Sequence, residues 1–204
     1  MRPLLPMLRQ LIFHPRKVHV IDDQRAWKGF ELYFGALHLA TAVEKATDRP
    51  HVGVMLPTSG LFPMALLAGW ILGRTVVPLN YLLKRDELDY VIEDAELDAV
   101  VTVTPMLDLF GGMPEGVQEL KLDEMRKSFK GLPKLRRAVR RGDDDVAVLL
   151  YTSGTSGKPK GVMLTAGNLA SNVRDSIDYV GFTGSDCMLG VLPQFHSFGL
   201  TVLT

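Results

Sequence analysis

The sequence predicts an α/β fold in which a largely parallel sheet is flanked by helices. Short aliphatic and β-branched runs alternate with longer segments of helical periodicity between residues 18 and 103. Such alternation is typical of β-α-β units, whose right-handed crossovers place the strands in parallel. The 204 residues, 47% of them hydrophobic, are enough for one domain with a substantial core.

The individual elements follow from apolar spacing and from the residues that begin or end each segment. Ser59 is suited to begin the helix that Gly73 ends, and Thr165 is suited to cap a later helix. The predicted helices are 29–47, 61–72, 84–96, 166–179 and a last one that begins at Ser197 or Phe198. The predicted strands are 18–21, 52–56, 75–79, 98–103, 146–150, 162–165 and 186–192.

Residues 104–145 break this alternation, because glycine and proline recur there and a basic run occupies residues 134–141. We expect a surface excursion with one strand near 117–122 and one short helix. The basic run favours a solvated, flexible face over a contact with an acidic membrane or with the phosphates of a nucleotide cosubstrate. The acidic run 143–145 favours a charged turn over a metal site.

Composition narrows the class of protein and its setting. The chain has 23 basic and 23 acidic residues, so nothing indicates a nucleic-acid partner. Cys187 is the single cysteine, which excludes an internal disulfide framework and a cysteine-based zinc site. We expect this thiol to pack inertly in a strand, in a reducing cytoplasm. No charged residue lies between His51 and Arg74, but the prolines, serine and glycine at 57–63 favour a buried strand, turn and helix over a membrane span.

The most informative stretch is the loop between the strands predicted at 146–150 and 162–165. Its hydroxyl side chains, its glycines, which let backbone amides approach an anion, and its two lysines suit it to bind phosphate. Charge-assisted hydrogen bonds to phosphate contribute about 1.5–3 kcal/mol each. The spacing fits neither a P-loop nor a dinucleotide-binding fingerprint, and a flexible polar connection is the alternative. The stretch reads Tyr151-Thr152-Ser153-Gly154-Thr155-Ser156-Gly157-Lys158-Pro159-Lys160-Gly161.

This stretch resembles the phosphate-binding motif of the adenylate-forming, or AMP-binding, superfamily. That motif begins with Tyr or Phe, continues with Thr-Ser-Gly, and then has two residues that are each Ser or Thr. It ends with Gly, any residue, and Pro-Lys-Gly. Residues 151–161 match every defined position. Residues 192–199 are similar to a second motif of the superfamily, which borders its acyl or aryl pocket. Residues 195–201 are especially similar to long-chain acyl ligases of the acyl-acyl-carrier-protein synthetase kind.

The resemblance implies an ATP-dependent acid–thiol ligase with the superfamily's α/β fold. A carboxylic acid, here a long-chain fatty acid, would form an acyl-adenylate with Mg²⁺-bound ATP, and the thiol of CoA or of an acyl carrier protein would then take the acyl group. Lys160 and His196 would act in catalysis, and Phe195 would line the acid pocket beside His196. The β- and γ-phosphates would be held by Thr152, Ser153, Gly154, Thr155, Ser156, Gly157, Lys158 and Lys160.

The same resemblance implies that residues 1–204 are the N-terminal portion of a longer AMP-binding domain. The sequence stops inside a predicted helix, and the resemblance places the carboxylate ligand of Mg²⁺ and a small C-terminal lid beyond Thr204. We therefore expect the chain by itself to be inactive. Two alternatives stay open: a non-catalytic nucleotide-binding or structural module, and a ligase for an amino or aryl acid. Peripheral association with the inner face of a membrane also stays open.

Overall fold

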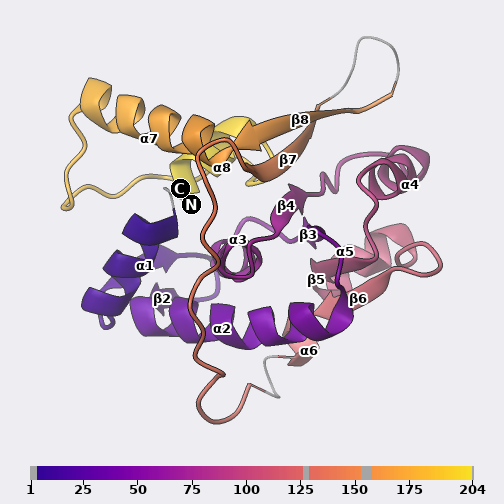
Figure 1. Ribbon diagram of the computed structural model, residues 1–204, viewed down its shortest axis with the longest axis horizontal. Helices are drawn as coiled ribbons and strands as arrows, with labels where there is room; N and C mark the ends of the chain where they lie inside the picture. Colours follow the sequence, from indigo (N-terminus) through magenta and orange to yellow (C-terminus); the bar gives the residue numbers. More distant parts are fainter. Residues whose placement is uncertain (1–3, 126–128, 153–157, 204) are drawn as a thin grey trace.

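The computed structural model describes residues 4–125, 129–152 and 158–203, and it confirms the α/β prediction (Figure 1). Six strands form one sheet in the order β6-β5-β3-β4-β7-β8. All neighbours in it are parallel except β7 and β8, which form an antiparallel pair. The strands are β3 (His51–Met55), β4 (Thr75–Pro78), β5 (Ala99–Thr102), β6 (Gln118–Lys121), β7 (Val146–Thr152) and β8 (Lys160–Thr165).

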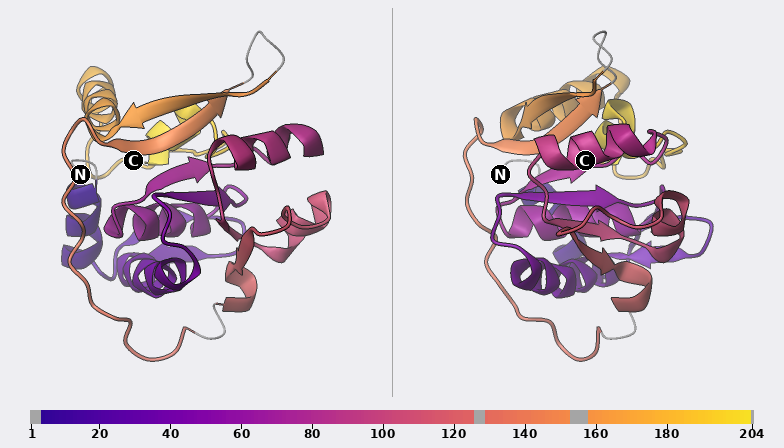
Figure 2. Two further views of the ribbon diagram at one scale, coloured as in Figure 1. Left: turned by 45° about the vertical axis from the view of Figure 1, so that its right-hand side comes forward. Right: turned by 90° about the vertical axis from the view of Figure 1, so that its right-hand side faces the viewer.

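The two faces of this sheet bury two separate groups of apolar side chains, as the period-two alternation of strand side chains requires. Val54 and Val76 belong to the core that contains helices α2 (Gly29–Ala46) and α3 (Leu61–Ile71). Met55 and Val77, the next residues along the same strands, belong to the core that contains α4 (Arg85–Asp94). The helices therefore lie on opposite faces of the sheet (Figure 2).

Helix α3 explains why the chain carries a long uncharged stretch. Every residue from Leu61 to Ile71 is buried, and the Trp70 indole nitrogen donates a hydrogen bond to the Ala147 carbonyl oxygen at 3.0 Å. A helix that is apolar all round is a core helix when it is this short. The prediction of a buried strand, turn and helix is thus confirmed, and none of the described helices is long and apolar enough to cross a membrane.

The sequence missed some elements and misjudged others. Helix α1 (Leu4–Phe13) was not predicted, nor was β2 (Ala26–Lys28), which pairs with β1 (Val18–Ile21). The excursion holds two short helices, α5 (Thr104–Phe110) and α6 (Leu122–Met125), where one was expected, whereas its single strand is confirmed as β6. Helix α7 (Ala166–Val180) begins as predicted, since Thr165 accepts a hydrogen bond from the Asn168 amide, and α8 (Ser197–Leu203) is also confirmed.

The strand predicted at 186–192 is wrong, because this stretch has no regular secondary structure. A strand needs a neighbour for its backbone hydrogen bonds, and none of the described strands pairs with it. Leu189 and Val191 are 87% and 75% exposed instead of buried in a sheet. Cys187 is exposed as well, which corrects the expectation of a packed core thiol.

The basic run 134–141 is only partly the solvated face that its composition predicts. Arg136 donates to the Glu44 carboxylate at 3.0 Å, and its side chain is only 10% exposed. Val139 lies over Gly73, whose φ of 71° and missing side chain leave room for it. The prediction of a charged turn is confirmed, because the backbone bends at residues 143–145, directly before β7 begins at Val146.

Candidate functional site

The carboxyl ends of β3, β4, β5 and β7 meet at one edge of the sheet, because these strands are parallel. Ligand sites of open α/β sheets gather at this edge, where the connections leave the strands. Three connections are relevant here: residues 56–60 after β3, residues 79–84 after β4, and the loop that joins β7 to β8.

The described ends of the phosphate-motif loop form the last pair of the β7–β8 ladder. Thr152 ends β7 opposite Lys160, which begins β8, and both residues are exposed. Gly161 lies opposite Tyr151, and a Cβ atom on it would come within 3.0 Å of Leu149 and 3.3 Å of the Tyr151 ring. Any other residue here would make the Leu149 and Tyr151 side chains shift by a few tenths of an ångström, so glycine suits close pairing at the base of the loop. The predicted phosphate contacts Ser153, Gly154, Thr155, Ser156 and Gly157 lie outside the described residues.

Helix α4 holds the base of this loop through a small polar cluster. The Tyr151 hydroxyl donates to Asp94 Oδ2 at 2.5 Å, and the Tyr90 hydroxyl donates to Asp94 Oδ1 at 3.3 Å. Lys158 Nζ lies 4.8 Å from the centroid of the Tyr90 ring, within cation–π distance. Burial, and then the hydrogen bond to Asp94, raise the pKa of Tyr151, so this phenol stays a donor at neutral pH.

The second motif reaches the same edge by packing on two of the strand connections. Phe195, which is 8% exposed, meets Tyr81 edge-to-face with ring centroids 4.9 Å apart, and Tyr81 follows β4. The Ser59 amide, after β3, donates to Gln194 Oε1 at 3.4 Å. A side chain on Gly199 would come within 2.2 Å of the Pro193 carbonyl oxygen, so only glycine lets the segment fold back on itself.

His196 is exposed, and it does not follow a strand end as the sequence predicted. The predicted strand before it is absent, but its neighbours Phe195 and Gln194 place it at the carboxyl edge. The Phe198 amide approaches His196 Nδ1 at 3.4 Å. If Nδ1 accepts this hydrogen bond, the neutral ring carries its proton on Nε2, which can donate to an oxygen of a ligand.

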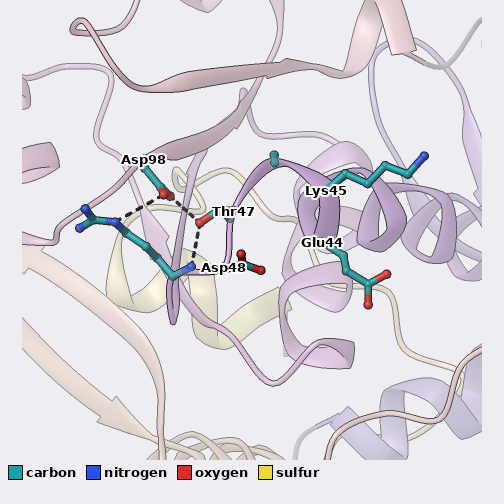
Figure 3. A pocket seen from close by; sticks show the side chains of 7 residues that line it. Glu44, Lys45, Thr47, Asp48 and Asp98 are labelled. Atoms are coloured by element: carbon teal, nitrogen blue, oxygen red, sulfur yellow. Dashed lines mark hydrogen bonds and ion pairs between the residues drawn. The ribbon is translucent and has the colours of Figure 1, made fainter.

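A hollow lies at the opposite edge of the sheet, where the strands begin (Figure 3). It measures about 420 Å³ and is lined by the end of α2, the turn after it and Asp98. Its polar groups bind one another: Thr47 donates to Asp98 at 2.5 Å, and Arg49 lies 3.4 Å from the same carboxylate. These contacts close a turn, and nothing in them indicates a ligand.

Three residues of the site escaped the sequence reasoning: Tyr81, Tyr90 and Asp94. Tyr81 closely follows the strand predicted at 75–79, so its place after β4 was a usable signal. Tyr90 and Asp94 are four residues apart on one helix, which puts them on one face. Their partner Tyr151 is 57 residues from Asp94, and local sequence spacing cannot reveal such a contact.

Comparison with known proteins gives a consistent result. The profile of the family described as AMP-binding enzyme matches residues 9–204. A 2-succinylbenzoate–CoA ligase from Enterococcus faecalis is 26% identical over 189 residues, which cover 89% of this chain and 37% of that protein. A mitochondrial malonate–CoA ligase from Xenopus laevis is 29% identical, over 97% of this chain and 36% of its own length.

A solved structure of o-succinylbenzoate–CoA synthetase from Bacillus subtilis, in complex with AMP, superposes with a TM-score of 0.83. It is 27% identical, and the match covers 97% of this chain and 51% of that one. The same enzyme has also been solved with ATP and magnesium ion. This chain thus spans about half or less of the length of these proteins.

Proposed function

Because the chain belongs to the AMP-binding enzyme family, we propose that it forms the ATP-phosphate and acid-binding part of an acid–thiol ligase. In the first step an oxygen of the acid carboxylate attacks the α-phosphorus of ATP, and pyrophosphate leaves. In the second step a thiolate attacks the acyl carbonyl carbon, and AMP leaves. The observation that carries the proposal is that the phosphate-motif hairpin and the Phe195 segment lie at the same carboxyl edge.

ATP suits the described donors at the base of the loop. Lys160 and Lys158 are exposed ammonium groups, and Thr152 adds a hydroxyl, all at the edge where the strands end. We assign the β- and γ-phosphates to Lys160 and Thr152 together with the hydroxyls and glycines of the motif, whereas Lys158 lies on the Tyr90 ring and supports the loop. Neither step requires a protein nucleophile, because positioning and charge neutralisation supply the catalysis.

The acid half of the site is assigned to the second motif. Phe195 and Tyr81 offer an apolar wall, and the exposed His196 offers a ring N–H to an oxygen of the carboxylate or of the adenylate. Magnesium is bound by the Bacillus relative together with ATP. Within the described ranges no three His, Cys, Asp or Glu side chains form a metal-binding group, so we assign no ligand of this chain to it.

The relatives favour CoA as the thiol and a dicarboxylic or aryl acid as the substrate. Those named above are ligases of 2-succinylbenzoate and of malonate with CoA. A long-chain fatty acid is the second candidate, and the observation in its favour is the similarity of residues 195–201 to long-chain acyl ligases. Binding of 2-succinylbenzoate, malonate and palmitate in the presence of Mg²⁺-ATP, measured as a thermal shift, distinguishes the two.

The decisive experiment is ATP binding by the purified chain, measured by isothermal titration calorimetry. Lys160→Ala should weaken binding by about tenfold or more, because one charge-assisted contact to phosphate is lost. Lys45→Ala is the matched control, since Lys45 is exposed at the opposite edge beside the hollow, and its affinity should not change. A folded chain that binds no ATP, or that binds it equally well without Lys160, would contradict the proposal.

A further inference from the structure

A charged segment far from the carboxyl edge has no role in the proposed ligase reaction. Residues 130–141, here called the basic strip, contain six of the 23 basic residues and no acidic residue. The whole chain is neutral, so the strip is a local excess of positive charge on a body that is otherwise more acidic than basic. Figure 1 shows it running across α2 as an extended connection without helix or strand.

The strip is fixed to the body of the protein by inward-pointing arginine side chains and by one backbone hydrogen bond. Arg136 donates to Glu44 at 3.0 Å and to Thr41 at 3.1 Å, both on α2. The Val139 amide donates to the Ile71 carbonyl oxygen at 3.0 Å, and Arg141 donates to the Gly73 carbonyl oxygen at 2.7 Å. These contacts hold the segment in one orientation and define which side chains face away.

The side chains that face outward combine exposed leucines with unpaired cations. Leu132 and Leu135 are 88% and 74% exposed, so neither side chain is part of the hydrophobic core. Lys130, Arg137 and Arg140 are exposed, and no described acidic side chain pairs with either arginine. Both arginines border one shallow hollow of about 410 Å³, so they flank the same space.

The carboxylates that pair with arginines of the strip, Glu44 and Asp145, bind Arg136 and Arg141, whose side chains point inward, so they do not cancel the outward charge. Glu44 is bound by Arg136 and lies 3.6 Å from Lys134. The hydrogen bond from Arg136, more than any other influence, lowers the pKa of Glu44, so the carboxylate stays ionised and paired inward. The outward cations are left to act on a partner.

We propose that the basic strip docks this protein on a bilayer that contains anionic phospholipids. Phosphate headgroups complement the arginines and lysines, and hydrocarbon just below them accepts the two leucines. A soluble acidic partner would satisfy the charges but would leave the leucines in water. Neither signal alone gives stable attachment, so the association should be reversible and should weaken as salt is added. This proposal does not depend on the ligase assignment.

Vesicle co-sedimentation tests the proposal on the whole chain. We expect binding to vesicles of phosphatidylcholine mixed with phosphatidylglycerol, and much weaker binding to phosphatidylcholine alone. Arg137→Gln combined with Arg140→Gln should lower partitioning by about 30-fold at low salt and should reduce its salt dependence. Leu132→Ser combined with Leu135→Ser should also lower partitioning but leave the salt dependence in place.

Matched controls separate the strip from the remainder of the surface. Arg16→Gln with Arg174→Gln removes two exposed arginines elsewhere, and Leu189→Ser removes an apolar side chain that is 87% exposed outside the strip. Both controls should bind vesicles as the wild type does, and all variants should melt alike because the changed side chains are exposed. Equal losses in the controls, no preference for anionic vesicles, or retention on an immobilised acidic polypeptide without vesicle binding would each overturn the proposal.

Discussion

Removing the Tyr151 hydroxyl should loosen the base of the phosphate-motif loop. In Tyr151→Phe the ring remains between β7 and α4, but the 2.5 Å hydrogen bond to Asp94 is lost. Hydrogen bonds to charged groups contribute about 1.5–3 kcal/mol to stability when the partners are buried. Asp94 is exposed and regains water, so we expect a loss of about 1 kcal/mol in the free energy of unfolding.

The pH dependence of stability gives an independent measure of the same contact. The folded pKa of Tyr151 is raised, so its contribution to stability is complete below the ordinary tyrosine pKa of about 10 and is lost as the pH rises toward the folded value. In that alkaline window the unfolded chain releases a proton that the folded chain retains. Tyr151→Phe should therefore flatten the decline in stability above about pH 10.

The assay is urea unfolding at neutral and alkaline pH, on the wild type, Tyr151→Phe, Asp94→Asn and the double variant. A coupling energy between the two single variants isolates their contact. Tyr179→Phe is the matched control, because Tyr179 is 93% exposed and its loss should change neither quantity. If Tyr151→Phe unfolds at the wild-type urea concentration with the same alkaline slope, the link between β7 and α4 does not stabilise the fold.

Three further predictions concern other parts of the chain. In a catalytically competent ligase that contains this chain, His196→Phe should depress acyl-adenylate formation with ATP affinity and melting temperature unchanged; an intact specific activity with a lowered melting temperature would contradict this. Gly73→Ala should cost about 1–2 kcal/mol in urea unfolding because φ there is 71°, whereas Gly184→Ala, with open space around it, should cost less. Burial by itself raises the pKa of Asp22, but hydrogen bonds from donors that include Trp27 outweigh burial, and the net pKa is lowered. The folded protein should therefore lose stability as the pH drops below about 4, and Asp22→Asn should lack that acid decline.

Local periodicity in the sequence was enough to find the elements that make the sheet. The buried runs at β3, β4 and β5 and the helices between them are each determined by residues adjacent in the chain, and the alternation fixed a parallel arrangement. Helix α1 was missed, although its one proline, Pro6, lies in the first turn, where proline removes no intrahelical hydrogen bond.

The features that could not be predicted depend on partners far away in the sequence. The apolar stretch 186–192 has the composition of a strand, but composition does not reveal whether another strand is there to pair with it. The basic strip looked uniformly solvated because Glu44, which binds Arg136, is 92 residues away. At the site, the motif supplied Lys160 and Phe195, whereas their supports on other connections, such as Tyr81, follow only from tertiary packing.

The two lysines of the phosphate motif differ in what surrounds them. Lys160 occupies a defined motif position and pairs in the ladder with Thr152, another defined position. Lys158 occupies the variable position, and its ammonium group lies on Tyr90, a residue of α4 outside the motif. Lys160 is therefore the better assignment for phosphate, and Lys158 belongs with Tyr90, Asp94 and Tyr151 to the local support that holds the loop on α4.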